Sequence, residues 1–273
     1  MLYTRSVIAS AEKTLQTDWF THAGEIIETI GHPRFPRVLA NALRDVAIFD
    51  YCVIFGYADG KQPLALYDDF PPDRQRMHVA DYLEGPYILD PFFLASRDPA
   101  RRGLYRLSEI APDRFYQGEY FKSYYEQTGL AEEIGYLVSV DDDLTLVISL
   151  MRTGKRFSAS AFRHLAAVWP VVSAASRQHW GGLEHAVADA EDGIETRIRN
   201  AFRSIGEGVL TPREREVVEY TLKGYSADAT GKALEISSGT IRIHRRNIYA
   251  KLRISSQGEL FSAFIRAIMQ NSC

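Results

Sequence analysis

The spacing of apolar residues predicts helices at both ends of the first 180 residues. Apolar positions recur every three to four residues over 19–30, 34–48 and 158–180, which is the period of a helix with one buried face. The last of these helices is predicted to kink at Pro170, because proline cannot donate the helical hydrogen bond. These helices are expected to cover whatever lies between them in the chain.

Two pairs of short strands are predicted between the helices. Residues 51–57 and 63–67 are rich in aromatic and β-branched side chains, and a second pair over 135–140 and 144–151 flanks the three aspartates 141–143. Strands joined by such short turns pair as antiparallel hairpins. Strands and helices are segregated rather than strictly alternating, so the sequence predicts an α+β domain built on an antiparallel sheet.

The last quarter of the chain carries the signals of four short helices. Thr211 and Glu214 have the spacing of a capping box, with a proline at the first helical position. Ser226 is placed to cap a second helix. A turn at Ile236-Ser237 then leads to a third helix over 238–252, and a fourth is predicted over 257–268. The sequence therefore predicts a second, all-α unit.

The third of these helices has a cationic face. Ile241 and Ile248 fall on one stripe, which is expected to pack on the core of the unit. Arg242, Ile243 and Arg246 project from the opposite side, and no acid lies between residues 235 and 259. Arginine can donate two hydrogen bonds to guanine, and isoleucine can contact a thymine methyl. These three residues are predicted to read bases in the major groove of double-stranded DNA.

Together these motifs resemble the LuxR-type four-helix DNA-binding domain. The resemblance rests on residues 210–217, 236–248 and 251–252. It implies that the third helix enters the major groove, that Arg242, Ile243 and Arg246 are the base readers, and that the fourth helix forms a dimer contact. It also implies that Thr240 contacts the DNA backbone. Basic side chains at the flanks of the helix are placed for phosphates; they are Arg245, Lys251 and Arg253.

One position departs from the family pattern. Thr230-Gly231 stands where the family usually has an isoleucine-alanine pair. Glycine lowers the stability of a helix by up to about 1 kcal/mol relative to alanine. The second helix is therefore expected to be less rigid than its relatives, with the fold unchanged.

Charge and cysteine content fit a DNA-binding protein of the cytoplasm. The net charge is −3, but residues 211–269 carry four more positive than negative side chains, and the rest carries seven more negative ones. This asymmetry suits a basic unit that meets a polyanion. Cys52 and Cys273 do not form a disulfide framework, which favours a reducing compartment. No signal peptide or apolar stretch of bilayer length is visible, so no membrane partner is expected.

The first 180 residues are predicted to sense a small molecule. They show neither the alternating pattern of a phosphoacceptor domain nor an ATP-binding glycine loop. Tyr82, Tyr87 and Asp90-Pro91-Phe92-Phe93 resemble a segment that lines the acyl-homoserine-lactone pocket of autoinducer-binding domains. The tryptophan usual between those tyrosines is absent, so this ligand is not predicted. The order of elements also resembles GAF and PAS sensor domains.

Aromatic residues with one fixed polar group are the expected lining of the pocket. Asp90 is predicted to hold an amine or amide hydrogen of the ligand. The alternative is that the aromatics only fill the core and that Asp90 caps a turn before Pro91. The candidate pocket residues are Tyr82, Tyr87, Asp90, Phe93, Tyr120, Tyr124 and Trp169.

The sequence thus predicts a cytoplasmic, quorum-sensing-like transcription regulator that acts as a homodimer. Residues 1–180 form the ligand-sensing domain, 181–209 a helical linker, and 210–273 the helix-turn-helix domain. DNA, an unidentified small molecule and RNA polymerase are the expected partners, without a cofactor or metal. No catalytic motif is visible, so the protein is not expected to be an enzyme. The alternative is a regulator switched by a protein partner, with no metabolite ligand.

Overall fold

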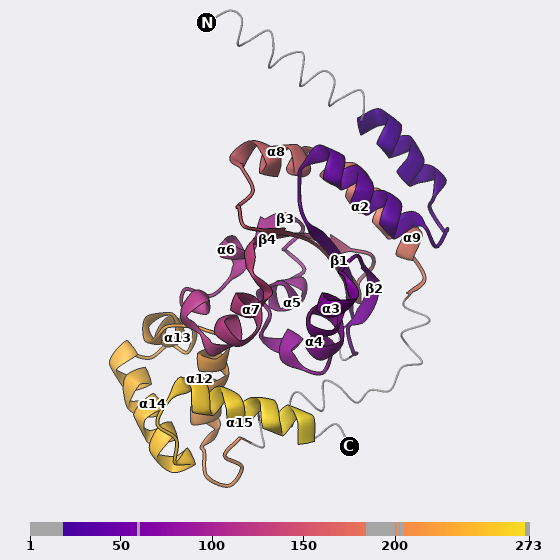
Figure 1. Ribbon diagram of the computed structural model, residues 1–273. Helices are drawn as coiled ribbons and strands as arrows, with labels where there is room; N and C mark the ends of the chain where they lie inside the picture. The colour runs from indigo at the N-terminus through magenta and orange to yellow at the C-terminus, as the bar shows by residue number, and fades with distance from the viewer. Residues whose placement is uncertain (1–18, 59–60, 184–199, 201, 203–204, 271–273) are drawn as a thin grey trace, which may run out of the picture.

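The computed structural model describes residues 19–58, 61–183, 200, 202 and 205–270. Residues 19–183 form a sheet with helices on both faces, named here the sheet domain, and residues 205–270 form a helical module (Figure 1). This is the predicted α+β domain followed by an all-α unit. Most of the predicted linker helix lies outside the described residues.

Five antiparallel strands make the sheet. Their order across the sheet is β2-β1-β5-β4-β3. Both predicted hairpins are confirmed, as β1–β2 and β4–β5, while the short edge strand β3 was not predicted. The strands are β1 Tyr51–Ala58, β2 Leu64–Asp68, β3 Gly103–Arg106, β4 Leu130–Ser139 and β5 Leu144–Thr153.

One face of the sheet is covered by the helices from the two ends of the domain (Figure 1). They are a helix over 19–28, α2 Phe35–Val46, α8 Ala159–Ala167 and α9 Trp169–Trp180. The predicted long helix is interrupted at Val168, and Pro170 lies in the first turn of α9, where its missing N–H costs nothing. Tyr136 of β4 fastens this layer by donating a hydrogen bond to the carbonyl of Leu165 at 2.8 Å.

Short helical segments cover the other face. Side chains alternate along a strand, so Val53 and Phe55 point to this face while Ile54 points to the α2 layer. The segments are α3 Pro72–Gln75, η1 Arg76–Ala80, α4 Asp81–Leu83, η2 Pro86–Leu89, α5 Pro91–Ser96, α6 Leu107–Ile110, η3 Phe115–Gln117, η4 Phe121–Tyr125 and α7 Glu126–Thr128. None of the described helices is long and apolar enough to cross a lipid bilayer.

The helical module has the four helices predicted from the sequence. They are α12 Pro212–Leu222, α13 Ala227–Ala233, α14 Ser238–Leu252 and α15 Gln257–Gln270. The capping box is formed: the amide of Glu214 donates to Thr211 Oγ1 at 3.2 Å, and the amide of Thr211 donates to Glu214 Oε2 at 2.8 Å. Both pairs satisfy amides that the first helical turn leaves free.

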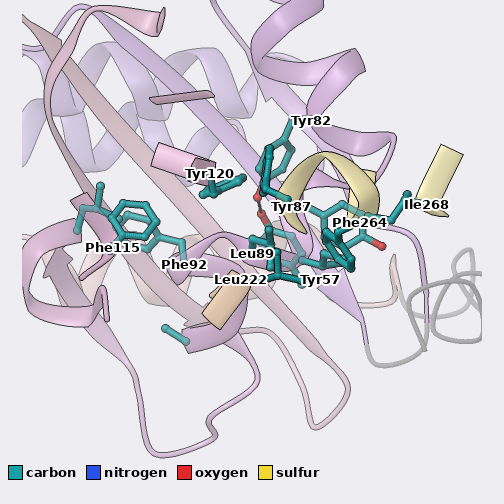
Figure 2. Close-up of a cluster of buried hydrophobic side chains, with 14 of the residues drawn as sticks. Tyr57, Tyr82, Tyr87, Leu89, Phe92, Phe115, Tyr120, Leu222, Phe264 and Ile268 are labelled. Carbon is teal, nitrogen blue, oxygen red and sulfur yellow. Dashed lines mark hydrogen bonds between the residues drawn. The ribbon is translucent and has the colours of Figure 1, made fainter. Parts of the chain in front are cut away.

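The sheet domain and the helical module share one apolar core. Figure 2 shows aromatic residues of the sheet domain, Tyr57 and Tyr87 among them, in the same cluster as Leu222, Phe264 and Ile268 of the module. The core continues from the sheet face that the short helices cover, through those helices, into α12 and α15. The short helices are therefore packed between the sheet and the helical module.

Candidate functional site

The predicted base readers lie together on the outer face of α14. Arg242, Ile243 and Arg246 are all exposed, and Ile243 keeps 52% of its surface. On the opposite side Ile241 and Ile248 are buried, at 0% and 1%. An exposed isoleucine between two arginines is compatible with contact to an apolar group such as a thymine methyl. The helix thus presents two guanidinium groups and one apolar side chain on one face.

Serine capping and a close turn set the direction of α14. Ser237 Oγ accepts from the amide of Thr240 at 3.0 Å and also bonds the Thr240 hydroxyl at 2.8 Å. Thr240, the predicted backbone contact, is half-buried at this first turn. Its hydroxyl is therefore held beside the start of the helix, where DNA phosphates bind helix amides in many complexes.

Gly231 has a structural role that the sequence did not reveal. It is buried within α13, and its carbonyl accepts from the amide of Ile236, in the turn to α14, at 2.9 Å. A β-carbon at this position would lie 2.7 Å from the carbonyl oxygen of Ile236, which is closer than real contacts allow. Because Gly231 has no side chain, the turn can lie close against α13. The lower helix propensity of glycine is thus accompanied by closer packing of the turn.

Two of the three basic residues predicted to contact phosphates form bonds with other residues of the module. Arg245 donates to the carbonyl of Tyr225 at 2.8 Å, and burial lowers the pKa of its guanidinium. Lys251 forms an ion pair with Glu214 at 2.7 Å. Arg253 is exposed at the C-terminal end of α14. Arg245 and Lys251 therefore also have partners within the module, and their contact with DNA phosphates stays a prediction, as it does for Arg253.

A cavity of about 50 Å³ lies between the lower face of the sheet and the short helices. That volume holds a few water molecules. The residues around it are mainly aromatic and aliphatic, with two carboxyl groups among them. They are Val53, Phe55, Tyr57, Met77, His78, Tyr82, Asp90, Phe92, Tyr120, Tyr125, Thr128, Leu130, Glu133, Val147, Ser149 and Met151.

Asp90 both caps a helix and lines this cavity. Its Oδ1 accepts from the amide of Phe92 at 2.7 Å at the start of α5. Its Oδ2 accepts from the hydroxyl of Tyr82 at 2.9 Å, and that hydroxyl lies 2.7 Å from the hydroxyl of Tyr57. Burial raises the pKa of Asp90 to about 6. Asp90 therefore caps a helix and lines the cavity at the same time, so the two interpretations of Asp90 do not exclude each other.

Glu133 is a second buried acid at the cavity, and the sequence did not single it out. It is 3% exposed on β4, and its Oε2 accepts from the hydroxyl of Tyr125 at 2.7 Å. Burial, and then the charge of Asp90, raise the pKa of Glu133 to about 8, while hydrogen bonds from Ser149 and Tyr125 oppose this. The strand was expected to begin at Gly135, so Glu133 was left outside it; extending the alternation of β4 by two residues would have placed it inward.

Three of the predicted pocket residues line the cavity, namely Tyr82, Asp90 and Tyr120. Tyr87 and Phe93 pack against each other beside it, with ring centroids 5.1 Å apart. The side chain of Tyr124 lies outside the described residues.

Trp169 does not belong to this pocket. It stacks on Tyr136 in the layer of α2 and α9, with ring centroids 6.0 Å apart. The placement of Trp169 in the pocket was wrong, because α9 covers the opposite face of the sheet.

Both the sheet domain and the helical module are similar to parts of known proteins. The family described as bacterial regulatory proteins, luxR family, matches residues 208–264. A putative helix-turn-helix transcriptional regulator encoded in the exeN 3′ region of Aeromonas salmonicida is 33% identical over 187 residues. That alignment covers 66% of this chain and 95% of the relative.

Similarity in the sheet domain extends to a solved structure. The VqsR LBD domain of Pseudomonas aeruginosa superimposes with a TM-score of 0.51 at 29% identity, over 59% of this chain and 95% of that one. The helical module alone is shared more widely. The response regulator protein TodT of Pseudomonas putida is 39% identical over 51 residues, which are 19% of this chain and 22% of TodT. The same helical module is therefore attached to different proteins.

Proposed function

Because this chain belongs to the LuxR family of helix-turn-helix transcriptional regulators, we propose that its cavity binds a small molecule and that binding controls the attachment of a dimer to DNA. In this proposal residues 1–180 sense the ligand, 181–209 connect the domains, and 210–273 bind DNA. The observation that carries the proposal is the cavity beside Asp90, in the same apolar core that reaches the DNA-binding helices.

The segment around Met77 gives a physical route from cavity to module. Met77 lines the cavity and also a groove of about 670 Å³ between the two parts of the chain. Ile265 and Ile268 of α15 line the same groove. A ligand that displaces Met77 would change the packing of α15, and it shifts the balance between arrangements only by its different affinity for each. Ligand control of DNA binding thus needs no long relay of residues.

The DNA contacts of the proposal come from α14. Arg242, Ile243 and Arg246 would read bases, while Thr240 and Arg253 would contact the DNA backbone. One such module reads few base pairs, so two copies on a two-fold symmetric site are expected. Arg245 and Lys251 join the phosphate contacts in this proposal only if their bonds to Tyr225 and Glu214 open on DNA.

A regulator switched by a protein partner is the second candidate function. It is favoured by Phe20 and Ile27, which are 75% and 60% exposed on the helix over 19–28. They are seven residues apart, so they lie on one side of that helix. A partner helix or a second copy of the chain would cover such a face. Substitution of both residues by glutamate would abolish regulation in this case, with the cavity intact.

Filling the cavity tests the leading proposal. Val147→Phe places a ring into the cavity, whereas Val209→Phe adds the same ring at an exposed valine. DNA sites selected from a random pool by the wild-type protein provide the probe for fluorescence anisotropy. We expect Val147→Phe to change DNA affinity at least five-fold and Val209→Phe to leave it unchanged. Equal affinity of all three proteins would contradict control through the cavity.

Native mass spectrometry of the same proteins supplies the second readout. A small molecule that copurifies with the wild type is expected to be lost from Val147→Phe and retained by Val209→Phe. Retention by both variants would place the bound molecule outside the cavity.

A further inference from the structure

Two carboxyl groups from separate elements line the same cavity. Asp90 stands at the start of α5 and is 6% exposed, and Glu133 on β4 is 3% exposed. Their charges interact, since the charge of Asp90 contributes to the raised pKa of Glu133. A buried acid usually has a basic partner or a metal ion, because an isolated buried charge is costly.

Within the described residues, no basic side chain forms an ion pair with these two acids. Among residues 19–58, 61–183 and 205–270, no lysine or arginine lines the cavity and no ion pair involves Asp90 or Glu133. His78 lines it, but burial lowers its pKa to about 4, so the ring is neutral at pH 7. Arg74 is nearby and is used elsewhere: it donates to the carbonyl of Thr128 at 3.1 Å. In the part of the chain that the structure describes, the cavity lining therefore has two acids and no cationic side chain.

The missing counter-charge favours proton binding by these acids. Burial raises the pKa of both carboxyl groups, and the charge of Asp90 adds to the rise at Glu133, so the protonated forms are favoured over their usual range. A positively charged group that entered the cavity would take the place of the proton and pair with the ionised acids.

The rest of the lining also suits a cation. The hydroxyls of Tyr82 and Tyr125 already donate to Asp90 and Glu133, so they are not free to donate to an anionic ligand. The faces of aromatic rings attract cations, and the lining includes Phe55, Tyr57, Tyr82, Phe92, Tyr120 and Tyr125. The cavity lining thus combines carboxyl acceptors with aromatic side chains.

We propose that this cavity selects small molecules that carry a cationic nitrogen, an ammonium or amidinium group, and holds that nitrogen between Asp90 and Glu133. The inference rests on the proposed function, since it names the chemical class of the ligand of the same cavity. The volume of about 50 Å³ limits the rest of the ligand to a short chain or small ring in this conformation. Met77 and Met151 at its wall are the flexible side chains that would yield to a larger molecule.

Three probes of similar size and different charge test the charge preference. Isothermal titration of the full chain at pH 7 compares n-butylamine, n-butanol and butyrate, with ionic strength equalised by sodium chloride. We expect the amine to bind at least ten-fold more tightly than the alcohol, and butyrate to show no binding. Amine affinity should rise from pH 6 to pH 8, with proton release, because buried carboxyl groups of raised pKa must ionise to pair with the ammonium.

The Glu133→Gln variant assigns the preference to the acid pair. It keeps the shape of the side chain and a hydrogen-bond acceptor for Tyr125. We expect it to weaken amine binding at least ten-fold and to leave alcohol binding unchanged. Glu126→Gln, at an exposed acid of α7, is the matched control and should behave as the wild type. If Glu133→Gln fails to fold by circular dichroism, Asp90→Asn serves as the second variant.

Each contrary result overturns the inference in a recognisable way. Alcohol binding as tight as amine binding would exclude charge selection while leaving the cavity as a ligand site. Unchanged amine affinity in Glu133→Gln would place the cation elsewhere. Absence of binding by all three probes would also overturn the inference, and the proposed function would still be decided separately by Val147→Phe.

Discussion

The carboxylate of Asp113 accepts a hydrogen bond from the backbone amide of Ser226 at 2.9 Å, and this bond joins the sheet domain to the helical module. Ser226 is the residue that caps α13. Next to it, the amide of Arg114 donates to the carbonyl of Gly224 at 3.0 Å. At the other end of the interface, Ile268 of α15 contacts Gly85. The DNA-binding helices are thus docked on the sheet domain by polar bonds at one end and apolar contact at the other.

Asp113→Ala is expected to loosen this docking. A typical hydrogen bond contributes about 1 kcal/mol, so the amide of Ser226 should open several-fold more often than in the wild type. Hydrogen–deuterium exchange of the peptide that contains Ser226 measures this directly. Asp142→Ala, at an exposed acid in the turn between β4 and β5, is the control and should leave exchange unchanged. Unaltered protection at Ser226 in Asp113→Ala would show that the bond does not hold the module.

Gly231→Ala is expected to lower stability, although helix propensity alone predicts the opposite. Alanine in a helix gains up to about 1 kcal/mol over glycine, but the new β-carbon would lie 2.7 Å from the carbonyl oxygen of Ile236. Overpacking of this kind costs about 1–3 kcal/mol. Urea unfolding measures the difference.

Gly239→Ala is the matched control for this substitution. It makes the same change in α14, where the nearest atom to the added carbon is Ser237 Oγ at 3.6 Å. We expect it to be neutral or slightly stabilising. Stabilisation by Gly231→Ala would remove the steric role assigned to Gly231.

Glu133→Gln is expected to reduce the pH dependence of folding. Burial raises the pKa of Glu133 in the folded protein from 4.5 to about 8. The folded state therefore binds more protons than the unfolded state between these values, and its stability falls as pH rises through this window. The wild type should lose stability from pH 5 to pH 8 more steeply than Glu133→Gln. Unfolding midpoints in urea at several pH values test this, and parallel curves for the two proteins would contradict it.

Arg246→Ala is expected to weaken sequence-specific DNA binding and relax discrimination at the base pair it reads, while the fold survives. Arg246 is exposed on α14, so truncation leaves no cavity, and loss of a bidentate base contact costs about 1–3 kcal/mol per base pair read. Anisotropy with selected and scrambled sites measures the specificity ratio. Retained discrimination in this variant would remove Arg246 from the base readers.

Arg253→Ala is expected to weaken binding to all DNA sequences alike. A lost phosphate contact lowers the dependence of affinity on salt concentration by about one unit of slope. Titrations at several salt concentrations give that slope for Arg253→Ala and for the wild type. An unchanged slope would argue that Arg253 does not reach a phosphate.

Local signals in the sequence were sufficient to predict the four helices of the helical module. The capping box at Thr211 and Glu214, the cap at Ser226 and the apolar stripe of Ile241 and Ile248 all act within a few residues of each other. Helix caps and helical periodicity are properties of neighbouring residues, so they can be read without the tertiary structure. Both hairpins of the sheet domain could be predicted for the same reason.

The pocket could be predicted only in part. Tyr82 and Asp90 lie eight residues apart and form one hydrogen bond, so a local motif identified them. Glu133 and Trp169 could not be placed in this way. Which face of the sheet each residue meets depends on strand boundaries and on the layer that each helix covers.

The sequence by itself determined the four helices of the DNA-binding module and the set of side chains on the outer face of α14, because these follow from short-range periodicity and capping, while the resemblance of its motifs indicated the family. Only the tertiary structure decided that Asp90 and Glu133 share one cavity, that Arg245 and Lys251 bond within the chain, and that Asp113 holds the start of α13. These contacts join residues far apart in the sequence. Their energies depend on burial and distance, which the order of residues alone does not specify.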